Sequence, residues 1–568
     1  MPTKITTAPL VGLLCSTGDR PQFLILTELT KIIDYLKSYT PLADYEQPAT
    51  IAPSSPHYLP IGSSWGYFTM YLNSLRMKLL GKLHLSQILL LVIIQALLGC
   101  QSERSDADLT GNTPATDFER FTIVNGWTVL SPSADSRVFY VSSSGNDSND
   151  GLSEASPKRT ITNALLQVRD DHPDWIKVKS GDTFSENRLT LHSGGLSISE
   201  PFVITSYGDG PRPILNETGL FYWGPNEPPG DALSHVAIVG LDFAGRYSTN
   251  PTASGNGKGI LFRGDLSNIL VEDCRFDDYS SGLHLQSRSD GPTRNNITIR
   301  RNTFVDSAEM GILASQGDTF TIEENIFDYN GFTNGATKFS HNIYLKEIKN
   351  TVLRNNIFAR GSNFGTKLSG DKPDSFTDFV VENNLYFDNG LSLDHSSGPT
   401  DDVQTTFTHN RGSVTRNVFT EIAKTFTGGL QQDLAVYALN TTNIEYRENL
   451  FVHKPSFANN NLFVWGSEHH KAITVAQTVI YNWPVDVNYI DDNKGSIDGY
   501  TKENNQINMS AASYLDPGRT VGTYFASIGG QTNALAFLQA ARGMSKSNWN
   551  PEFTADAVNN YIRAGFNR

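Results

Sequence analysis

The sequence has little cysteine and no excess of basic residues. Three cysteines, Cys15, Cys100 and Cys274, stand among 568 residues, too few for a disulfide framework. Asp and Glu number 59 against 45 Lys and Arg, giving a formal net charge of −14, whereas a general nucleic-acid-binding protein shows a basic surface. We also find no zinc-type cluster and no phosphate-cradling glycine loop. These absences argue against disulfide scaffolds and nucleic-acid partners.

What the sequence does have is a four-residue phrase that recurs seven times: two polar residues, a small apolar or charged residue, then an aromatic residue. The copies are Asp273–Phe276, Arg301–Phe304, Glu324–Phe327, Asn355–Phe358, Asn383–Tyr386, Arg416–Phe419 and Glu448–Phe451. Their aromatic residues are 28, 23, 31, 28, 33 and 32 residues apart. This period is typical of a solenoid, in which each unit buries its apolar face by stacking on the next. Alternating segments such as Asn268–Val271 predict strands.

The second position of the phrase is Asn in six of the seven copies. Stacked Asn side chains can hydrogen-bond along a solenoid and satisfy their own amides, so the pattern predicts a buried ladder. Cys274 takes this position in the first copy, and we therefore expect a buried core thiol rather than a reactive one.

An apolar run follows two lysines well inside the chain. Lys78 and Lys82 precede Leu85–Leu98, a run too short for a comfortable membrane span, which ends in Gly99-Cys100. This pattern resembles a bacterial lipoprotein signal peptide with its lipobox. The resemblance implies cleavage before Cys100, lipidation of its thiol and, because no Asp follows the cysteine, sorting to the outer membrane. An ordinary membrane anchor is the alternative.

Because a signal peptide must be N-terminal, we predict that translation begins at Met77 and that residues 1–76 are a non-native upstream extension. Residues 77–99 are then the signal peptide. Residues 100–135 are predicted to be the lipidated cysteine and a flexible tether, since residues 101–118 are polar and lack apolar periodicity.

A strand over Val138–Val141, a short amphipathic helix over Thr160–Val168 and a strand and turn over Trp175–Phe184 open the mature chain. This order resembles the N-terminal entry of right-handed parallel β-helix proteins of the pectate-lyase-like superfamily. The resemblance implies an all-β fold over residues 136–520, with the helix capping the open end of the solenoid.

Two further segments complete the domain plan. Residues 530–568 show helical periodicity, which predicts a C-terminal helical cap over residues 521–568 packed on the last coils. The loop Asn146–Gly151 offers oxygen ligands for Ca²⁺ but lacks the glutamate that closes an EF-hand, so a plain turn is favoured. We predict no other cofactor.

The strands that follow the second turn of each coil can be aligned by their apolar positions, which predicts two outward columns of side chains. One holds His284, Leu313, Tyr344, Lys367 and Ser392, and the other holds Gln286, Ser315, Lys346, Ser369 and Asp394, with Arg288 and Asp371 beyond. We predict that the catalytic residues are Lys367, Tyr344, Lys346 and His341. The predicted substrate-binding residues are His284, Gln286, Arg288, Asp394 and His395.

These residue types suit β-elimination in a uronate polymer. A cation must neutralise the carboxylate next to the weakly acidic C5 proton, and a Lys, His or Tyr must move protons. Each residue also has a plainer interpretation: the lysines as solvated charges, Tyr344 as a stacking platform, the histidines as loop hydrogen-bonders, and Asp394 and His395 as the end of a coil.

We therefore expect a monomeric, surface-anchored polysaccharide lyase whose partners are an acidic polysaccharide and, through the lipid, the outer membrane. Lysines rather than Ca²⁺ are expected to neutralise the substrate. A glycoside hydrolase using Asp371 and Asp394, an epimerase that shares the first step of the lyase, and a non-catalytic glycan-binding lipoprotein remain as alternatives.

Overall fold

The computed structural model describes residues 121–223, 232–249, 257–286, 294–331, 340–395, 407–422, 434–454, 463–465, 469–483, 490–491 and 497–568. Residues 1–76, predicted as an upstream extension, residues 77–99, predicted as a signal peptide, and Cys100 lie outside these residues. None of the helices in the described ranges has the length and apolar character needed to cross a membrane.

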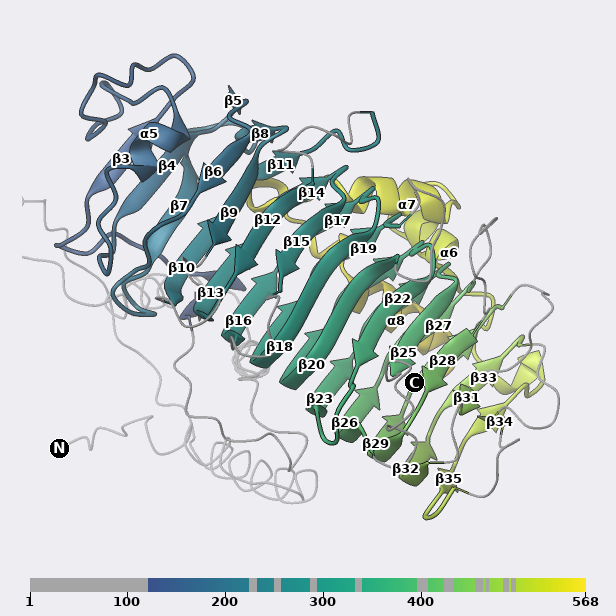
Figure 1. Ribbon diagram of the computed structural model, residues 1–568. Helices are drawn as coiled ribbons and strands as arrows, with labels where there is room; N and C mark the ends of the chain where they lie inside the picture. The colour runs from purple at the N-terminus through teal and green to yellow at the C-terminus, as the bar shows by residue number, and fades with distance from the viewer. Residues whose placement is uncertain are drawn as a thin grey trace, which may run out of the picture. The chain divides into compact units, whose positions relative to one another are not determined.

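The described chain winds into a parallel β-solenoid with three strands in each coil (Figure 1). One coil contains β13 (Leu266–Glu272), β14 (Arg275–Asp277) and β15 (Ser281–Leu285), after which β16 (Arg294–Arg300) pairs with β13 and begins the next coil. We call the sheets that contain β13, β15 and β14 the first, second and third face. β18 (Met310–Glu323) and β20 (His341–Arg354) run through both the second and the first face.

The remaining strands fall into the same three faces. The first face also holds β3 (Val138–Val141), β4 (Trp175–Lys179), β7 (Phe202–Tyr207), β10 (Leu233–Val239), β23 (Phe376–Glu382), β26 (His409–Thr415), β29 (Thr441–Arg447), β32 (His470–Ala476) and β35 (Thr501–Glu503). The second face also holds β6 (Arg188–Thr190), β9 (Gly219–Trp223), β12 (Lys258–Arg263), β22 (Phe364–Ser369), β25 (Leu391–His395), β28 (Leu434–Ala438), β31 (Phe463–Trp465) and β34 (Ile490–Asp491). The third face also holds β5 (Thr183–Phe184), β8 (Ile214–Asn216), β11 (Asp242–Ala244), β17 (Thr303–Val305), β19 (Ile326–Asp328), β21 (Ile357–Ala359), β24 (Leu385–Phe387), β27 (Val418–Thr420), β30 (Leu450–Val452), β33 (Val479–Tyr481) and β36 (Gln506–Ile507).

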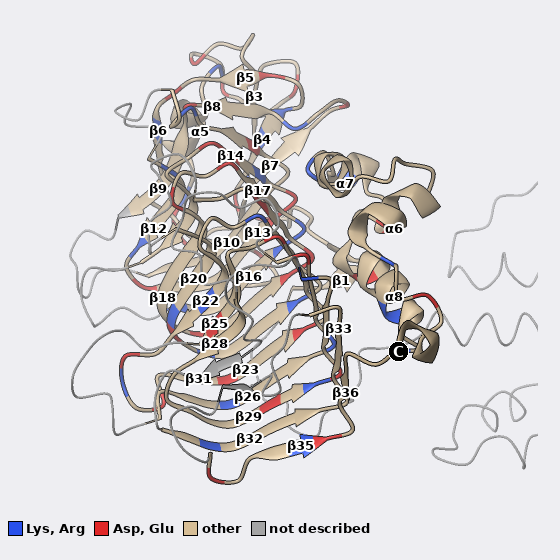
Figure 2. Cartoon of the chain, turned by 90° about the vertical axis from the view of Figure 1, so that its right-hand side faces the viewer, with Lys and Arg blue, Asp and Glu red and all other residues tan. Residues whose placement is uncertain are grey.

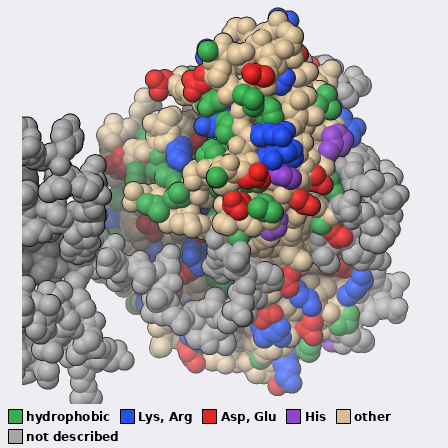
Figure 3. Space-filling model, turned by 90° about the vertical axis from the view of Figure 1, so that its left-hand side faces the viewer, with side chains coloured by type: hydrophobic (Ala, Val, Ile, Leu, Met, Phe, Trp, Pro, Cys, Tyr) green, Lys and Arg blue, Asp and Glu red, His purple; other side chains and the backbone are tan. Residues whose placement is uncertain are grey.

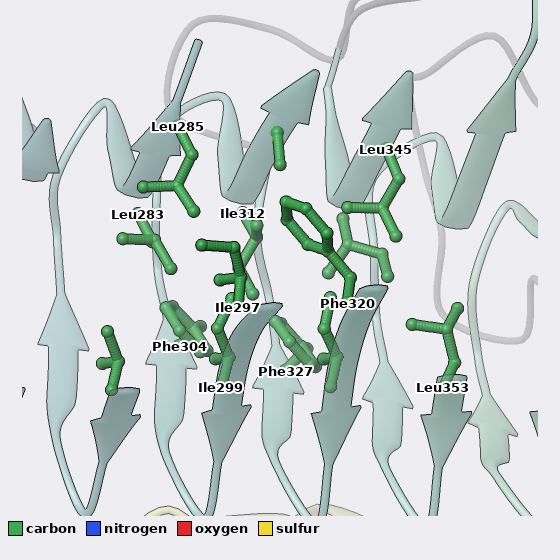
Figure 4. Close-up of a cluster of buried hydrophobic side chains, with 14 of the residues drawn as sticks. Leu283, Leu285, Ile297, Ile299, Phe304, Ile312, Phe320, Phe327, Leu345 and Leu353 are labelled. Atoms are coloured by element: carbon green, nitrogen blue, oxygen red, sulfur yellow. The ribbon is translucent and has the colours of Figure 1, made fainter. Parts of the chain in front are cut away.

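The recurring phrase builds the corner between the first and third faces. Its first residue has positive φ, as at Arg301 (52°) and Asn355 (56°), and so turns the chain. Its aromatic residue points into the core, where the rings from Phe243 to Phe451 stack at centroid distances of 4.6–5.1 Å. Figure 4 shows Phe304 and Phe327 among the surrounding Leu and Ile side chains. Each copy of the phrase therefore forms one corner of a coil and adds one aromatic layer to the core.

The Asn ladder is confirmed. From Asn325 onward, the side-chain oxygen of each Asn accepts hydrogen bonds from the backbone and side-chain amides of the Asn one coil earlier, at 2.9–3.1 Å. The oxygen of Asn302 accepts from the backbone amide of Cys274. The six members are Asn302, Asn325, Asn356, Asn384, Asn417 and Asn449. Cys274 is buried at the head of the ladder, as predicted, and burial raises the pKa of its thiol to about 12. A thiol with so high a pKa stays protonated at neutral pH, as expected of a core residue rather than a reactive one.

The C-terminal segment is helical as predicted, but its position differs from the prediction. α6 (Val521–Ser527), α7 (Ala534–Ala541) and α8 (Ala555–Gly565) lie along the flank of the solenoid rather than over its last coils (Figures 1 and 2). The short helices η2 (Ala511–Ser513), η3 (Lys546–Asn548) and η4 (Pro551–Phe553) connect them. Arg542 binds Asp306 and Asp328 in the middle coils, and the backbone amide of Lys546 reaches Asp273 further back.

The reason for this position is the outer side of the third face. From β19 onward the first residue of each strand on this face is apolar and belongs to one cluster with the helices: Ile326, Ile357, Leu385, Val418, Leu450 and Val479. An apolar outer row of this length requires a cover, and the C-terminal helices supply it.

Residues 121–135, predicted as part of the tether, instead contact the solenoid. They include the hairpin of β1 (Ile123–Val124) and β2 (Trp127–Thr128). The hydroxyl of Thr128 donates to the carboxylate of Glu272 at 2.8 Å, and the guanidinium of Arg301 lies 4.4 Å from the rings of both Trp127 and Trp549. The two ends of the described chain therefore meet on one corner of the solenoid.

At the N-terminal entry, β3 has its predicted bounds, and the segment predicted as a strand and turn over Trp175–Phe184 contains β4 and β5. The capping helix α5 (Ile161–Leu165) is shorter than predicted. The carboxylate of Asp147 accepts hydrogen bonds from the backbone amides of Arg159 and Thr160 and from the Thr160 hydroxyl. These bonds tie the polar loop to the start of α5, which matches the turn rather than the Ca²⁺ interpretation of this loop.

Candidate functional site

Strand pairing on the second face brings two tyrosines, a lysine and an aspartate into one outward column. Tyr344 of β20 pairs with Lys367 of β22, Lys367 with Asp394 of β25, and Asp394 with Tyr437 of β28. Paired residues of a parallel sheet lie about 4.8 Å apart, so the four occupy consecutive coils. We call Tyr344, Lys367, Asp394 and Tyr437 the reactive column.

The predicted alignment of this column was wrong at β25. It placed Ser392 beside Lys367, because Gly390 was matched with Gly365. In the structure Leu391 pairs with Phe364, so Asp394 lies beside Lys367 instead. A shift of two residues preserves the alternation of inward and outward side chains. Apolar periodicity alone therefore does not reveal it.

Lys367 lies at the centre of the column. Its ammonium is 3.1 Å from a carboxylate oxygen of Asp394, 4.9 Å from the ring centre of Phe364 and 5.8 Å from that of Tyr344. The Asp394 side chain is 1% exposed and that of Lys367 is 18% exposed. The buried carboxylate of Asp394 thus holds the partly exposed ammonium of Lys367 near the ring of Tyr344.

Lys346 extends the site along β20, two residues beyond Tyr344. Its ammonium is 2.5 Å from Asp371, with exposed fractions of 34% and 22% for the two side chains. Burial alone would lower the pKa of Lys346, but the Asp371 carboxylate outweighs it and raises the pKa above its usual value. Lys346 is therefore firmly charged.

Both lysines of the predicted cationic surface are thus paired with a carboxylate, so these two residues supply no surplus positive charge. Figure 3 shows Lys and Arg side chains beside Asp and Glu on the side of the molecule that it views. In the described residues no three His, Cys, Asp or Glu side chains lie close enough together to hold a metal ion.

A second row of residues supports the reactive column from three positions earlier on each strand: His341, Phe364, Leu391 and Leu434. His341 is 1% exposed, stacks on Phe364 at 4.7 Å and meets the ring of Tyr344 edge-on at 5.5 Å. Neither ring nitrogen has a hydrogen-bond partner among the described residues. Burial, and then the charge of Lys367, hold the pKa of His341 well below its usual value, so it is a neutral support for Tyr344 rather than an exposed base.

His284 belongs to the same outward column but lies two coils away from Tyr344, with Leu313 between them. Its Nε2 is 3.0 Å from the Gln286 side-chain oxygen. Burial, and then the charge of Lys258, lower the pKa of His284 to about 4. His284 and Gln286 therefore form a neutral pair beside the reactive column, and Arg288 lies outside the described residues.

The prediction of His395 as a substrate-binding residue was wrong. It points into the solenoid, is fully buried, and has its ring 5.3 Å from Phe379, 6.0 Å from His409 and 6.1 Å from Tyr446. The outward position of Asp394 on β25 explains the error, because neighbouring residues of a strand point to opposite sides and His395 therefore points inward.

Tyr437 is the member of the reactive column that the sequence prediction missed. A long connection separates it from Asp394, so the alignment stopped before reaching β28. The alternation Leu434-Ala435-Val436-Tyr437-Ala438 is the signal that would have found it.

Comparisons with known proteins agree with this architecture. Residues 259–480 match a family described as the right handed beta helix region. These residues form part of the parallel β-solenoid described above, in agreement with that description. No curated protein matches it.

Several solved structures resemble this β-helix protein. A lacto-N-biosidase from Eubacterium ramulus is 15% identical, with 66% of this chain and 68% of that chain covered and a TM-score of 0.39. A mannuronan C-5 epimerase module from Azotobacter vinelandii is 14% identical, covering 61% and 90% with a TM-score of 0.40. A pectate lyase is 16% identical, covering 71% and 87% with a TM-score of 0.35. A shared fold of this kind hosts many chemistries.

Proposed function

We propose that this protein is a polysaccharide lyase that cleaves a uronate-containing polysaccharide by β-elimination on the second face. The observation that carries the proposal is the placement of Tyr344, Lys367 and Lys346 together, with the buried Asp394 fixing Lys367. A phenol and two ammonium groups are the side chains that this reaction needs within reach of one sugar unit.

In the proposed reaction the ammonium groups of Lys367 and Lys346 pair with the substrate carboxylate and stabilise the charge that develops when C5 loses its proton. Tyr344 donates its hydroxyl proton to the glycosidic oxygen as its oxygen accepts the proton from C5. The C5–H and C4–O bonds break, a C4–C5 double bond forms, and the leaving sugar keeps its oxygen as a hydroxyl. No water is consumed. His341 is withdrawn as a catalytic group and assigned to holding the Tyr344 ring.

The location is also part of the proposal. The lipoprotein-like signal and Cys100 support a lipid-anchored protein of the outer membrane. Such an anchor would hold the enzyme where extracellular or periplasmic polymers are met. Mass spectrometry of the mature protein for a diacylglyceryl group on Cys100 tests this part directly.

A glycoside hydrolase is the second candidate. It is favoured by one observation: each lysine is matched by a carboxylate, Asp394 or Asp371, so the surface is also compatible with a neutral glycan. A hydrolase needs two carboxyl groups facing one bond, and here each is held by a different lysine, which is why we prefer the lyase.

The two candidates are separated by their products. The mature protein is incubated with a panel of uronate, sulfated and neutral polysaccharides, while ultraviolet absorbance and reducing ends are followed together. Absorbance rising with reducing ends supports the lyase, because the new double bond absorbs. Reducing ends alone support the hydrolase. Neither signal, together with a change in sugar configuration by NMR, points to an epimerase; neither signal and no such change would leave the glycan-binding interpretation.

A further inference from the structure

Tyr437 occupies the far end of the reactive column, three coils from Tyr344. It pairs with Asp394, and its side chain is half-buried against the apolar cluster of Phe364, Leu391 and Leu434. Burial, and then the charge of Asp394, raise the pKa of Tyr437. Its phenol therefore stays protonated, and its ring is held in place by packing.

The column has an aromatic ring at each end and an ion pair between them. Tyr344 packs against His341, and Tyr437 packs against the cluster that contains Leu434. In both cases the supporting residue lies three positions earlier on the same strand. Three strand spacings of about 4.8 Å separate the two tyrosines, roughly 14 Å in all. A pyranose unit of an extended polymer is about as long as one such spacing, so the two rings bracket about four sugar units.

We propose that Tyr437 is a second sugar-binding platform, which holds the part of the chain beyond the cleaved bond by stacking on a pyranose face. This rests on the proposed function, since it places the reacting sugar over Lys367 between the two rings. Stacking on an aromatic face is insensitive to charge, so this position accepts a sugar unit without needing a cation next to Asp394. The protein is then selective for oligosaccharides long enough to reach both rings.

The test measures affinity against length. Oligomers of polygalacturonate and of alginate, from two to six units, are titrated calorimetrically into the mature protein and its Tyr437→Ala, Tyr437→Leu and Tyr437→Phe variants. We expect Tyr437→Ala to weaken binding of oligomers of four or more units about tenfold and of dimers less than twofold. Tyr437→Phe keeps the ring and should lose far less. Tyr437→Leu fills the place against Leu434 without an aromatic face, and should match Tyr437→Ala.

Tyr140→Ala serves as the control, because Tyr140 is a half-buried tyrosine of β3 on the first face. Equal affinities for wild type and Tyr437→Ala at every length would overturn the platform. Turnover of the same oligomers is followed in parallel. Length-dependent affinity that is lost in Tyr437→Ala without any turnover would retain the platform and overturn the lyase. Turnover together with unchanged affinity in Tyr437→Ala would retain the lyase and overturn the platform. Absence of binding by every oligomer would overturn both the lyase and the platform.

Discussion

Lys367→Met is expected to destabilise the protein strongly, because it leaves a buried carboxylate without its cation. Asp394 is 1% exposed, and the ammonium of Lys367 lies 3.1 Å from it. Removing one partner of a buried pair costs about 3–5 kcal/mol of unfolding free energy. Asp394→Asn should cost less, about 2 kcal/mol, because Lys367 is 18% exposed and reaches water. The double variant should cost less than the sum of the two.

Urea denaturation followed by circular dichroism measures these differences, with the midpoint read at an unchanged slope. The matched control is the pair of Lys346 and Asp371, whose side chains are 34% and 22% exposed. Its coupling in the same double-mutant cycle should be below about 1 kcal/mol. A coupling for Lys367 and Asp394 no larger than that of the control would refute the reasoning that burial makes this pair different.

Three further predictions concern the rest of the molecule. Asn356→Ala should cost about 3 kcal/mol in urea denaturation, because it removes an acceptor for the buried backbone and side-chain amides of Asn325 and a donor to the carbonyl of Ile322; Asn216→Ala, at an exposed side-chain contact with Ser185, should cost below about 1 kcal/mol, and equal losses would contradict the ladder. Arg542→Ala should loosen the C-terminal helices, because it removes one of the two arginines that pair with the fully buried Asp328. Limited proteolysis should then cut within residues 515–568 faster than in wild type. An unchanged cleavage pattern would show that apolar packing alone holds the helices. His409 has its pKa lowered by burial from 6.5 to about 4. The folded state thus binds fewer protons than the unfolded chain, and the stabilising contribution, complete above pH 6.5, should be lost as the pH falls towards 4; a His409→Gln variant with the same pH dependence as wild type would contradict this.

The solenoid was predictable because each residue of its repeating phrase has one structural role. The first polar residue of each phrase adopts positive φ, the Asn joins the ladder and the aromatic residue stacks, so the phrase states a corner and a core layer at once. The bounds of β3 were predicted, and the strand and turn predicted over Trp175–Phe184 contain β4 and β5.

The site was predicted only in part, because the sequence shows which residues face outward but not how coils are matched. Lys367 and Tyr344 fell in the same column by correct alignment, whereas the two-residue shift at β25 placed Asp394 beside Ser369 instead of beside Lys367. Ion pairing depends on this match, so the neutralisation of both lysines was invisible in the sequence.

The position of the C-terminal helices was missed although its signal was present. Residues on either side of the stacked aromatic, such as Ile357 and Ala359 around Phe358, are apolar and lie on the outside of the third face. An outward apolar row predicts a cover along the flank, while helical periodicity alone says nothing of where a helix packs.

The most direct test of the central claim is the effect of Tyr344→Phe on turnover of the polysaccharide that gives the strongest ultraviolet signal. The variant keeps the ring that rests on His341 and removes only the hydroxyl proposed to carry the proton. We predict a fall in kcat of at least about 100-fold with little change in KM, while Lys349→Met, an exposed lysine of the same strand on the first face, should leave both values unchanged. Wild-type turnover by Tyr344→Phe would contradict the account, because the reactive column would then bind sugar without carrying out the proton transfer.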